Sequence, residues 1–273
     1  MFPIQLGLKA SCAPEQVASR LKYHPDVFEF FTSETDFTTD GLKQLEEAIK
    51  KVKSSGVKTI VLHHPMKYHG KRLELVAHPQ NNAELVNFID FSTQKLLDLA
   101  KTYHSKVLVH GSYELEEAEL LEPFDSIEEA RKYLFTRMDH FCHIGKDHIM
   151  FENGISKLYS YGNPDFDHLL AEKGYPLAYD VSHAFIYLHG DNKALQKSLK
   201  TLKDNIVHYH LVDSLGETHD SLTLGHGKID WDKALPLFNE KASSIYEINL
   251  KDLTNPFEQL ESHAYLKQIA QDL

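Results

Sequence analysis

The chain contains the segment Ile206-Val207-His208-Tyr209-His210-Leu211-Val212-Asp213, which is followed after a polar loop by Thr223-Leu224-Gly225-His226-Gly227-Lys228-Ile229. A β-branched apolar run that ends in His210 and then breaks into a loop predicts a buried strand with an imidazole at its C-terminal end. Enzymes built on parallel barrels carry their catalytic groups at that end of the strands. His210 is therefore the first candidate for a functional side chain.

Other strand-like runs in the chain end in the same manner. Their last residues are His64, His110, Glu152, Asp180 and Glu247. All of these are residue types that commonly bind metal ions, and the C-terminal ends of parallel strands meet at one face of a barrel. The pattern predicts that several separate elements deliver ligands to one place.

The chain alternates strand-like and helix-like segments eight times, in units of about 30 residues. We expect strands near residues 4–9, 27–31, 57–64, 106–110, 148–152, 177–180, 206–210 and 244–247. Amphipathic helical segments follow them, with N-caps expected at Thr39 or Asp40 and at Ser126, and a helix end at Gly174. This order predicts a (β/α)8 TIM barrel that spans residues 1–273 as a single domain. An open doubly wound sheet is the alternative, but the turn after the first strand lacks a GxGxxG pattern.

Composition narrows the class of protein. The chain has 273 residues and is 42% hydrophobic, enough for a sizeable core. Neither an export signal nor an apolar run of about 18 residues is visible, so we expect a cytoplasmic protein without a membrane span. Cys12 and Cys142 are expected as free thiols. The net charge of −11 argues against sequence-independent binding of nucleic acid, although a local basic groove is compatible with it.

Taken together, the motifs resemble the xylose isomerase-like superfamily of metal-dependent TIM barrels, which includes ketose 3-epimerases, sugar-phosphate isomerases and endonuclease IV. The resemblance spans nearly the whole chain by order of elements. It rests on Phe151-Glu152-Asn153, Asp180-x-x-His183, His210-Leu-Val-Asp213, the segment 224–231 and Glu247.

The resemblance implies a divalent-metal site. The isomerases and epimerases of the superfamily hold one ion with residues that correspond to Glu152, Asp180, His210 and Glu247. Three carboxylates and one imidazole suit Zn²⁺ or Mn²⁺, with Mg²⁺ or Co²⁺ as alternatives. Glu152 and Glu247 are then the expected catalytic pair, one removing a proton next to a carbonyl and the other returning one.

Endonuclease IV carries further ligands, so that one to three ions are expected in total. The corresponding positions here are His64 or its neighbour His63, His110, His183 and His219. Counting back from Gly225 places Ser221 where the family has a second ligand in the loop after strand seven. One ligand therefore changes type and one is lost, which weakens the case for a complete cluster.

Several histidines have a simpler interpretation. His140 and His143 are expected on the solvated face of an outer helix, and His208, two residues below His210, in an interior layer of the barrel. His69, His78 and His226 are expected in loops.

The sequence favours a metal-dependent isomerase or epimerase acting on a small sugar, sugar phosphate or polyol. A zinc phosphodiesterase of the endonuclease IV or UV-damage endonuclease type is the second hypothesis, and a barrel that serves only as a binding module is the third. The sequence leaves the substrate, the metal and the oligomeric state open, with a homodimer as one option.

Overall fold

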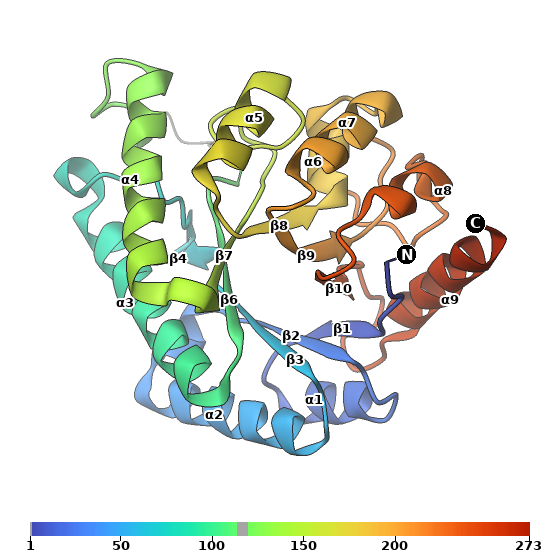
Figure 1. The fold of residues 1–273 in the computed structure, drawn as a ribbon. Helices are drawn as coiled ribbons and strands as arrows, with labels where there is room; N and C mark the ends of the chain where they lie inside the picture. Colours follow the sequence, from blue (N-terminus) through green and yellow to red (C-terminus); the bar gives the residue numbers. More distant parts are fainter. Residues whose placement is uncertain (1, 114–119) are drawn as a thin grey trace.

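A computed structural model describes residues 2–113 and 120–273. Its centre is a sheet of eight parallel strands in the order β1-β2-β3-β6-β7-β8-β9-β10 (Figure 1). The strands are β1 (Gly7–Ala10), β2 (Val27–Phe31), β3 (Thr59–His63), β6 (Lys106–His110), β7 (Ile149–Glu152), β8 (Leu177–Asp180), β9 (Ile206–Leu211) and β10 (Ser243–Tyr246). The last strand lies beside the first, so the sheet is nearly closed into a barrel. The predicted (β/α)8 barrel is confirmed as a single domain.

Glycine is required where the barrel closes. A Cβ atom on Gly7 would lie 1.9 Å from the carbonyl oxygen of Ser244 in β10. No real Cβ atom approaches a backbone oxygen so closely, so β1 reaches β10 only because residue 7 has no side chain.

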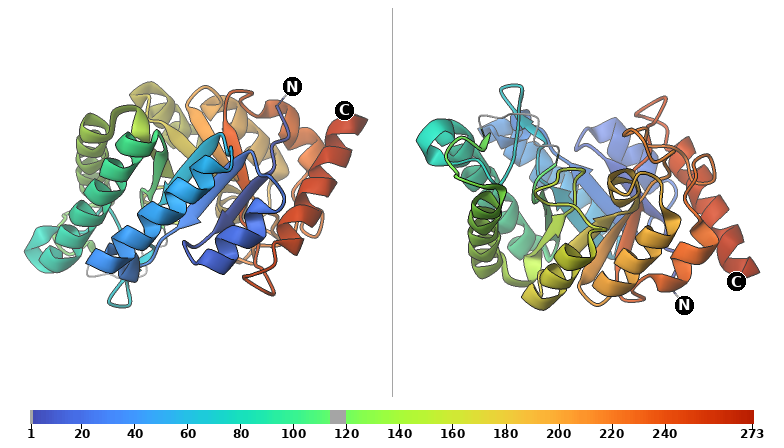
Figure 2. Two further views of the ribbon diagram at one scale, coloured as in Figure 1. Left: turned by 90° about the horizontal axis from the view of Figure 1, so that it is seen from below. Right: turned by 90° about the horizontal axis from the view of Figure 1, so that it is seen from above.

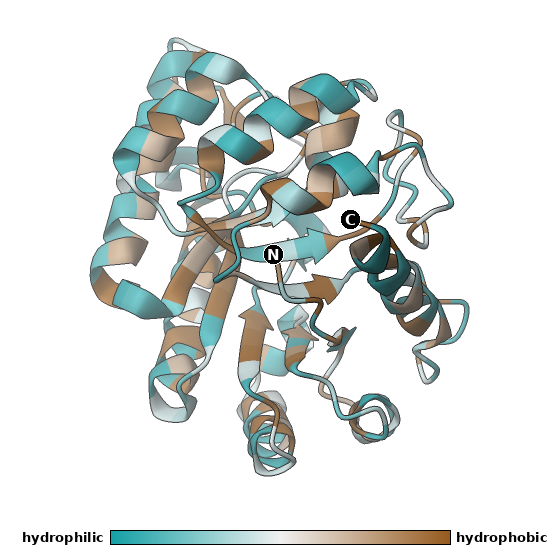
Figure 3. Ribbon diagram, turned by 45° about the vertical axis from the view of Figure 1, so that its right-hand side comes forward, coloured by the Kyte–Doolittle hydropathy of each residue, from teal (hydrophilic) through white to brown (hydrophobic). Residues whose placement is uncertain are grey.

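Helices surround the barrel on its outside (Figures 1 and 2). They are α1 (Pro14–Leu21), α2 (Thr39–Ser54), α3 (Pro79–Tyr103), α4 (Ile127–Gly145), α5 (Pro164–Lys173), α6 (Val181–Tyr187), α7 (Asn192–Leu202), α8 (Trp231–Ala234) and α9 (Phe257–Asp272). Hydrophilic and hydrophobic residues alternate along them, as in amphipathic helices (Figure 3). In α2 the buried residues are Leu45, Ala48, Ile49 and Val52. No helix in residues 2–113 or 120–273 has the length and apolarity to cross a membrane.

The helix ends agree only in part with the sequence. Ser126 caps α4 by accepting the Glu129 N–H, and Gly174 follows α5 in the left-handed conformation, as expected. The N-cap of α2 is Thr38 rather than Thr39 or Asp40, because its hydroxyl accepts the Gly41 N–H at 3.0 Å.

Two local features were not predicted. The loop after β3 contains a short antiparallel hairpin, β4 (Lys67–Tyr68) with β5 (Lys71–Arg72). The short helix α6 follows β8 directly, and its N-cap is Asp180. Both features lie at the C-terminal end of the barrel, where the candidate ligands are.

The barrel interior below the candidate ligands has an apolar side and a polar side. Strand pairing and the two-residue period of each strand stack Val61 below His63, Leu108 below His110, Met150 below Glu152 and Ala178 below Asp180. Val61, Leu108, Met150 and Ala178 form a small apolar cluster of their own. On the opposite side the interior is polar, with Lys9, Glu29 and His208 all buried.

Candidate metal centre

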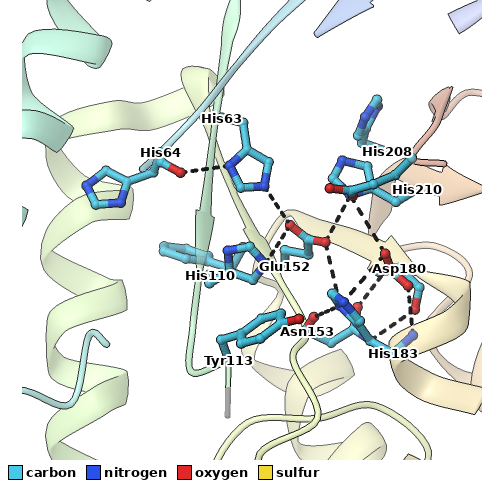
Figure 4. A network of polar contacts seen from close by, with 12 residues as sticks. His63, His64, His110, Tyr113, Glu152, Asn153, Asp180, His183, His208 and His210 are labelled. Atoms are coloured by element: carbon cyan, nitrogen blue, oxygen red, sulfur yellow. Dashed lines mark hydrogen bonds and ion pairs between the residues drawn. The ribbon is translucent and has the colours of Figure 1, made fainter. Parts of the chain in front are cut away.

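Four residues at the C-terminal ends of consecutive strands bring their side chains to one point. Glu152 ends β7, Asp180 ends β8, His210 lies near the end of β9, and Glu247 directly follows β10. One ligand atom from each of the four lies within 4.8 Å of the others. The four residues that the resemblance implies as ligands are therefore brought together in space. Figure 4 shows Glu152, Asp180 and His210 of this set directed toward one another.

His210 is at the centre of this group. Its Nδ1 lies 2.9 Å from Glu152 Oε1 and 3.9 Å from Asp180 Oδ2, and it also contacts Glu247 Oε2. Its other nitrogen, Nε2, faces Glu29 Oε2 at 3.0 Å. The ring thus presents one nitrogen to three carboxylates and the other to a fourth.

A second group shares Glu152. His110 Nε2 lies 3.0 Å and His63 Nε2 3.3 Å from Glu152 Oε2, and these three residues also have the spacing of a metal site. One ion on each side of the Glu152 carboxylate is thus compatible with the geometry.

His63, and not His64, belongs to this group. The side chain of His64 turns away from the cluster, and its Nε2 lies 2.7 Å from Ser92 Oγ on α3 (Figure 4). Burial lowers the pKa of His64 to about 3, so the ring is neutral. The two residues point to opposite faces of the strand end. Of the two alternatives that the resemblance left open, the geometry therefore brings His63 to Glu152 and places His64 outside the group.

His183 and His219 form a pair at the edge of the site. Their Nε2 atoms are 2.9 Å apart, and His183 Nδ1 faces the carbonyl oxygen of Asn153 at 2.8 Å. The spacing Asp180-x-x-His183 has a structural cause, since Asp180 Oδ1 accepts the His183 backbone N–H at 2.7 Å as the N-cap of α6. Asp180 Oδ2 remains directed to the centre of the site.

The pKa values of the side chains at the centre depend on the charges of their neighbours. Burial favours the neutral form of Glu152, but His110 and His210 outweigh it and hold the pKa of this carboxyl well below its usual value. Burial likewise lowers the pKa of His210, yet Glu152, Glu29 and Glu247 together raise it well above its usual value. Asp180 is the exception, because burial with Glu152 and Glu247 raises its pKa despite His183.

Several buried ligand atoms lack a well-oriented hydrogen bond within the described residues. They are Glu152 Oε1 and Oε2, Asp180 Oδ2, His210 Nδ1, Glu247 Oε2 and His110 Nε2. Buried polar atoms without such bonds are costly, and so many around one point are most simply satisfied by a cation. The donor set therefore fits a divalent ion held by Glu152, Asp180, His210 and Glu247.

Two residues of this region were missed in the sequence. Lys9 Nζ lies 2.5 Å from Glu247 Oε1 and 2.9 Å from Glu29 Oε1. Glu29 is fully buried in β2, within the run Val-Phe-Glu-Phe-Phe. A single charged residue inside an otherwise apolar strand was the available signal, because such a charge is tolerated only where the interior supplies partners.

The motif 223–229 has a structural role instead. Asp213 accepts N–H groups from Gly225 at 2.8 Å and Ile229 at 3.3 Å, and the indole N–H of Trp231 at 3.1 Å. A Cβ on Gly227 would lie 2.2 Å from Asp213 Oδ1. The loop is thus folded around one buried carboxylate, while His226 stays exposed. His140 and His143 are exposed on α4, as expected.

A cavity of about 440 Å³ opens above the cluster. Its lining includes Lys9, His63, His110, His183, His219 and Glu247, with Phe31, Tyr113 and Leu250 among the apolar and aromatic contributors. The side chain of Glu247 is 29% exposed, whereas that of Glu152 is 0% exposed. A small molecule in this cavity would therefore meet Glu247 before Glu152.

Comparison with known proteins agrees with this architecture. A crystal structure of a D-tagatose 3-epimerase-like protein superposes with a TM-score of 0.73 at 18% identity, covering 98% of this chain and 97% of the other. D-Psicose 3-epimerase with D-tagatose, from Clostridium cellulolyticum H10, gives 0.68 at 12% identity over 98% of both chains. A crystal structure of SacUVDE gives 0.63 at 15% identity, covering 97% of this chain and 99% of the other.

At these identities the structural neighbours establish the fold alone. None of the curated proteins matches the chain. The sequence model of the xylose isomerase-like TIM barrel family, however, matches residues 25–269, which is most of the chain. This protein therefore belongs to the xylose isomerase-like TIM barrel family.

Proposed function

We propose that this protein is a divalent-metal-dependent isomerase or epimerase that acts on a small sugar, sugar phosphate or polyol. The observation that carries the proposal is the convergence of Glu152, Asp180, His210 and Glu247, with ligand atoms within 4.8 Å of one another, below a cavity of about 440 Å³. A mostly carboxylate set suits Mn²⁺, Mg²⁺, Co²⁺ or Zn²⁺. When bound, such an ion would polarise a carbonyl and its neighbouring hydroxyl.

The two glutamates have unequal positions in this proposal. Glu247 faces the cavity and is the carboxylate that takes the proton from the carbon next to the carbonyl. Glu152, which is fully buried and in contact with His63 and His110, is proposed as the partner that returns a proton and also holds the metal. Both carboxylates are proposed metal ligands, so replacing either should weaken metal binding, and at saturating metal turnover should still fall far more than substrate binding.

The neighbours in structure support a carbohydrate ligand without naming one. Two of them are described as ketose 3-epimerases or epimerase-like proteins. The cavity volume lies in the range of small-molecule sites. We propose the carbohydrate class on these grounds and leave the individual sugar to experiment.

A zinc phosphodiesterase is the second candidate. It is favoured by the additional group His63, His110 and Glu152, and by the pairing of His183 with His219. Two features argue against a phosphodiesterase. Ser221 lies at the position of a further ligand, and the net charge of −11 opposes binding to phosphate backbones.

A solvent-exchange experiment separates the candidates. The protein, loaded in turn with Mn²⁺ or Zn²⁺, is incubated in deuterated water with a panel of ketoses, ketose phosphates and polyols and, separately, with duplexes that carry an abasic site or a UV lesion. Proton abstraction by a carboxylate predicts a rearranged sugar with deuterium at the carbon next to the carbonyl.

Two variants test whether turnover depends on the Glu247 carboxylate. Glu247→Gln should lower turnover by about 100-fold or more at saturating metal, where the weaker binding expected from the loss of one carboxylate ligand does not account for the effect. Asp167→Asn, at a buried carboxylate that contacts Gly162, is the control and should leave turnover unchanged. Strand incision with no change in any sugar would reject the isomerase proposal in favour of the phosphodiesterase.

A further inference from the structure

The barrel contains a layer of buried ionic residues directly below the candidate metal centre. Glu29 on β2 is 0% exposed and receives two imidazoles on the same oxygen, His208 Nε2 at 3.2 Å and His210 Nε2 at 3.0 Å. Its second oxygen lies 2.9 Å from Lys9 Nζ. The same ammonium lies 2.5 Å from Glu247 Oε1. One lysine and one glutamate thus touch two of the four candidate ligands from below.

The spacing of Glu29, His208 and His210 also has the dimensions of a metal site. The surroundings oppose that interpretation. The atoms that would hold such an ion already hydrogen-bond one another, because both Nε2 atoms face Glu29 Oε2, and the ammonium of Lys9 lies on the other oxygen of Glu29. The second nitrogen of His208, Nδ1, lies 2.6 Å from Ser243 Oγ. Ser243, His208, Glu29 and His210 therefore form a chain of hydrogen bonds rather than a second site.

This chain determines which way the His210 ring faces. A carboxylate can only accept, so the contact with Glu29 requires a proton on His210 Nε2. The lone pair available to a cation is then on Nδ1, which is the nitrogen that faces Glu152, Asp180 and Glu247. Lys9 acts on the other side, because it holds Glu247 Oε1 and leaves Oε2 directed at the same point.

We infer that Glu29 and Lys9 are positioning residues of the metal centre, with Glu29 fixing the orientation of the His210 ring and Lys9 fixing the Glu247 carboxylate. The inference rests on the metal binding in the proposed function, and not on the identity of the substrate. Neither residue touches the proposed ion, and both act through a ligand.

The test measures the affinity of the purified, chelator-treated protein for Zn²⁺ and Mn²⁺ by calorimetry. Glu29→Leu removes the acceptor of the His210 Nε2 proton and should weaken binding by about 10- to 100-fold. Glu29→Gln removes the same charge but keeps an oxygen that accepts this proton, so it should recover most of the affinity. If Glu29→Gln and Glu29→Leu weaken binding equally, the charge of Glu29 matters and its positioning role is refuted.

A second readout reports the ring directly. In the Zn²⁺-loaded protein with ¹⁵N-labelled histidine, NMR should show the His210 proton on Nε2 in the wild type. Glu29→Leu should redistribute that proton or the metal between the two nitrogens. A wild-type protein with its His210 proton on Nδ1 would overturn the inference.

For Lys9, the conservative replacement tests whether a cationic donor to Glu247 is what the site requires. Lys9→Met frees Glu247 Oε1, and Lys9→Arg keeps a cation that can donate to it. On an identified substrate, kcat should fall at least 10-fold with Lys9→Met, should be partly restored in Lys9→Arg, and KM should change less than kcat. Equal kcat in wild type and Lys9→Met would refute the role of Lys9.

The outcomes separate this inference from the proposed function. A wild-type protein that binds no divalent ion rejects both. A protein whose metal affinity follows the Glu29 series but which converts no sugar keeps the inference and loses the isomerase proposal. Asp167→Asn, distant from the chain of hydrogen bonds, should leave metal affinity unchanged.

Discussion

Asp180→Asn should raise or preserve the stability of the ion-free protein while reducing the stability gained from metal. The replacement is nearly isosteric, and the remaining carbonyl oxygen can still accept the His183 N–H and the Ser182 hydroxyl as the cap of α6. What is lost is the negative charge of Oδ2. Burial, with Glu152 and Glu247, raises the pKa of Asp180 against the effect of His183, so its anion is unfavourable when no ion is present.

The magnitude follows from linkage between binding and folding. An ion at about one hundred times its Kd stabilises the folded state by about 2.7 kcal/mol. For 273 residues, with an unfolding entropy of about 2 cal/mol/K per residue, this corresponds to about 5 °C in Tm. Loss of one ligand should weaken binding by about 10-fold or more, so the same ion concentration should raise the Tm of the variant by less than about 3 °C.

The assay is thermal unfolding of both proteins, with chelator and with saturating Mn²⁺ or Zn²⁺. Asp167→Asn is the matched control, because it neutralises a buried aspartate whose carboxylate accepts the Gly162 N–H away from the site. It should change the Tm without changing the increment due to metal. If Asp180→Asn gains as many degrees from the ion as the wild type does, Asp180 is not a ligand of that ion.

Three further predictions concern separate parts of the structure. His63→Ala should lower the number of ions bound at saturation or their affinity, whereas His64→Ala should leave both unchanged, as measured by metal analysis after gel filtration. Burial raises the pKa of Asp167 from 3.8 to about 6, so ionisation of this residue opposes folding, and the free energy of unfolding should fall as pH rises from about 4 to 6. In urea titrations, Asp167→Asn should remove this part of the decline, which is on the order of 2 to 3 kcal/mol. Gly7→Ala should destabilise the fold by about 3 kcal/mol or more, because its Cβ would overlap Ser244 in β10, and an unchanged unfolding midpoint would refute the barrel closure described here.

Much of the barrel could be predicted because its strands carry a strong local signal. The runs that end in His110, Glu152 and Asp180 are short and apolar, and each forms a strand that ends at the predicted residue. Local patterns also indicated the cap of α4 at Ser126. The hairpin β4–β5 and helix α6 lack such patterns, since their residues are ordered by contacts at the barrel end.

The sequence indicated which strand ends carry the candidate ligands, but not which side chain at a strand end faces the barrel interior. His63 is the last residue of the third strand and His64 follows it, and only the register against β2 and β6 decides which of them faces the interior. Lys9 and Glu29 were missed for a related reason. Their partners are Glu247, His208 and His210, which lie far away in the sequence and approach only when the barrel closes.

If Glu152, Asp180, His210 and Glu247 hold one divalent ion together, a crystal soaked in Mn²⁺ or Zn²⁺ and measured at the absorption edge of the metal should show the ion between them. We predict an anomalous peak within about 2.0 to 2.3 Å of an atom from each of the four side chains, including His210 Nδ1. A crystal with no peak between these residues, or with the ion bound elsewhere, would show that the four side chains do not form the metal site.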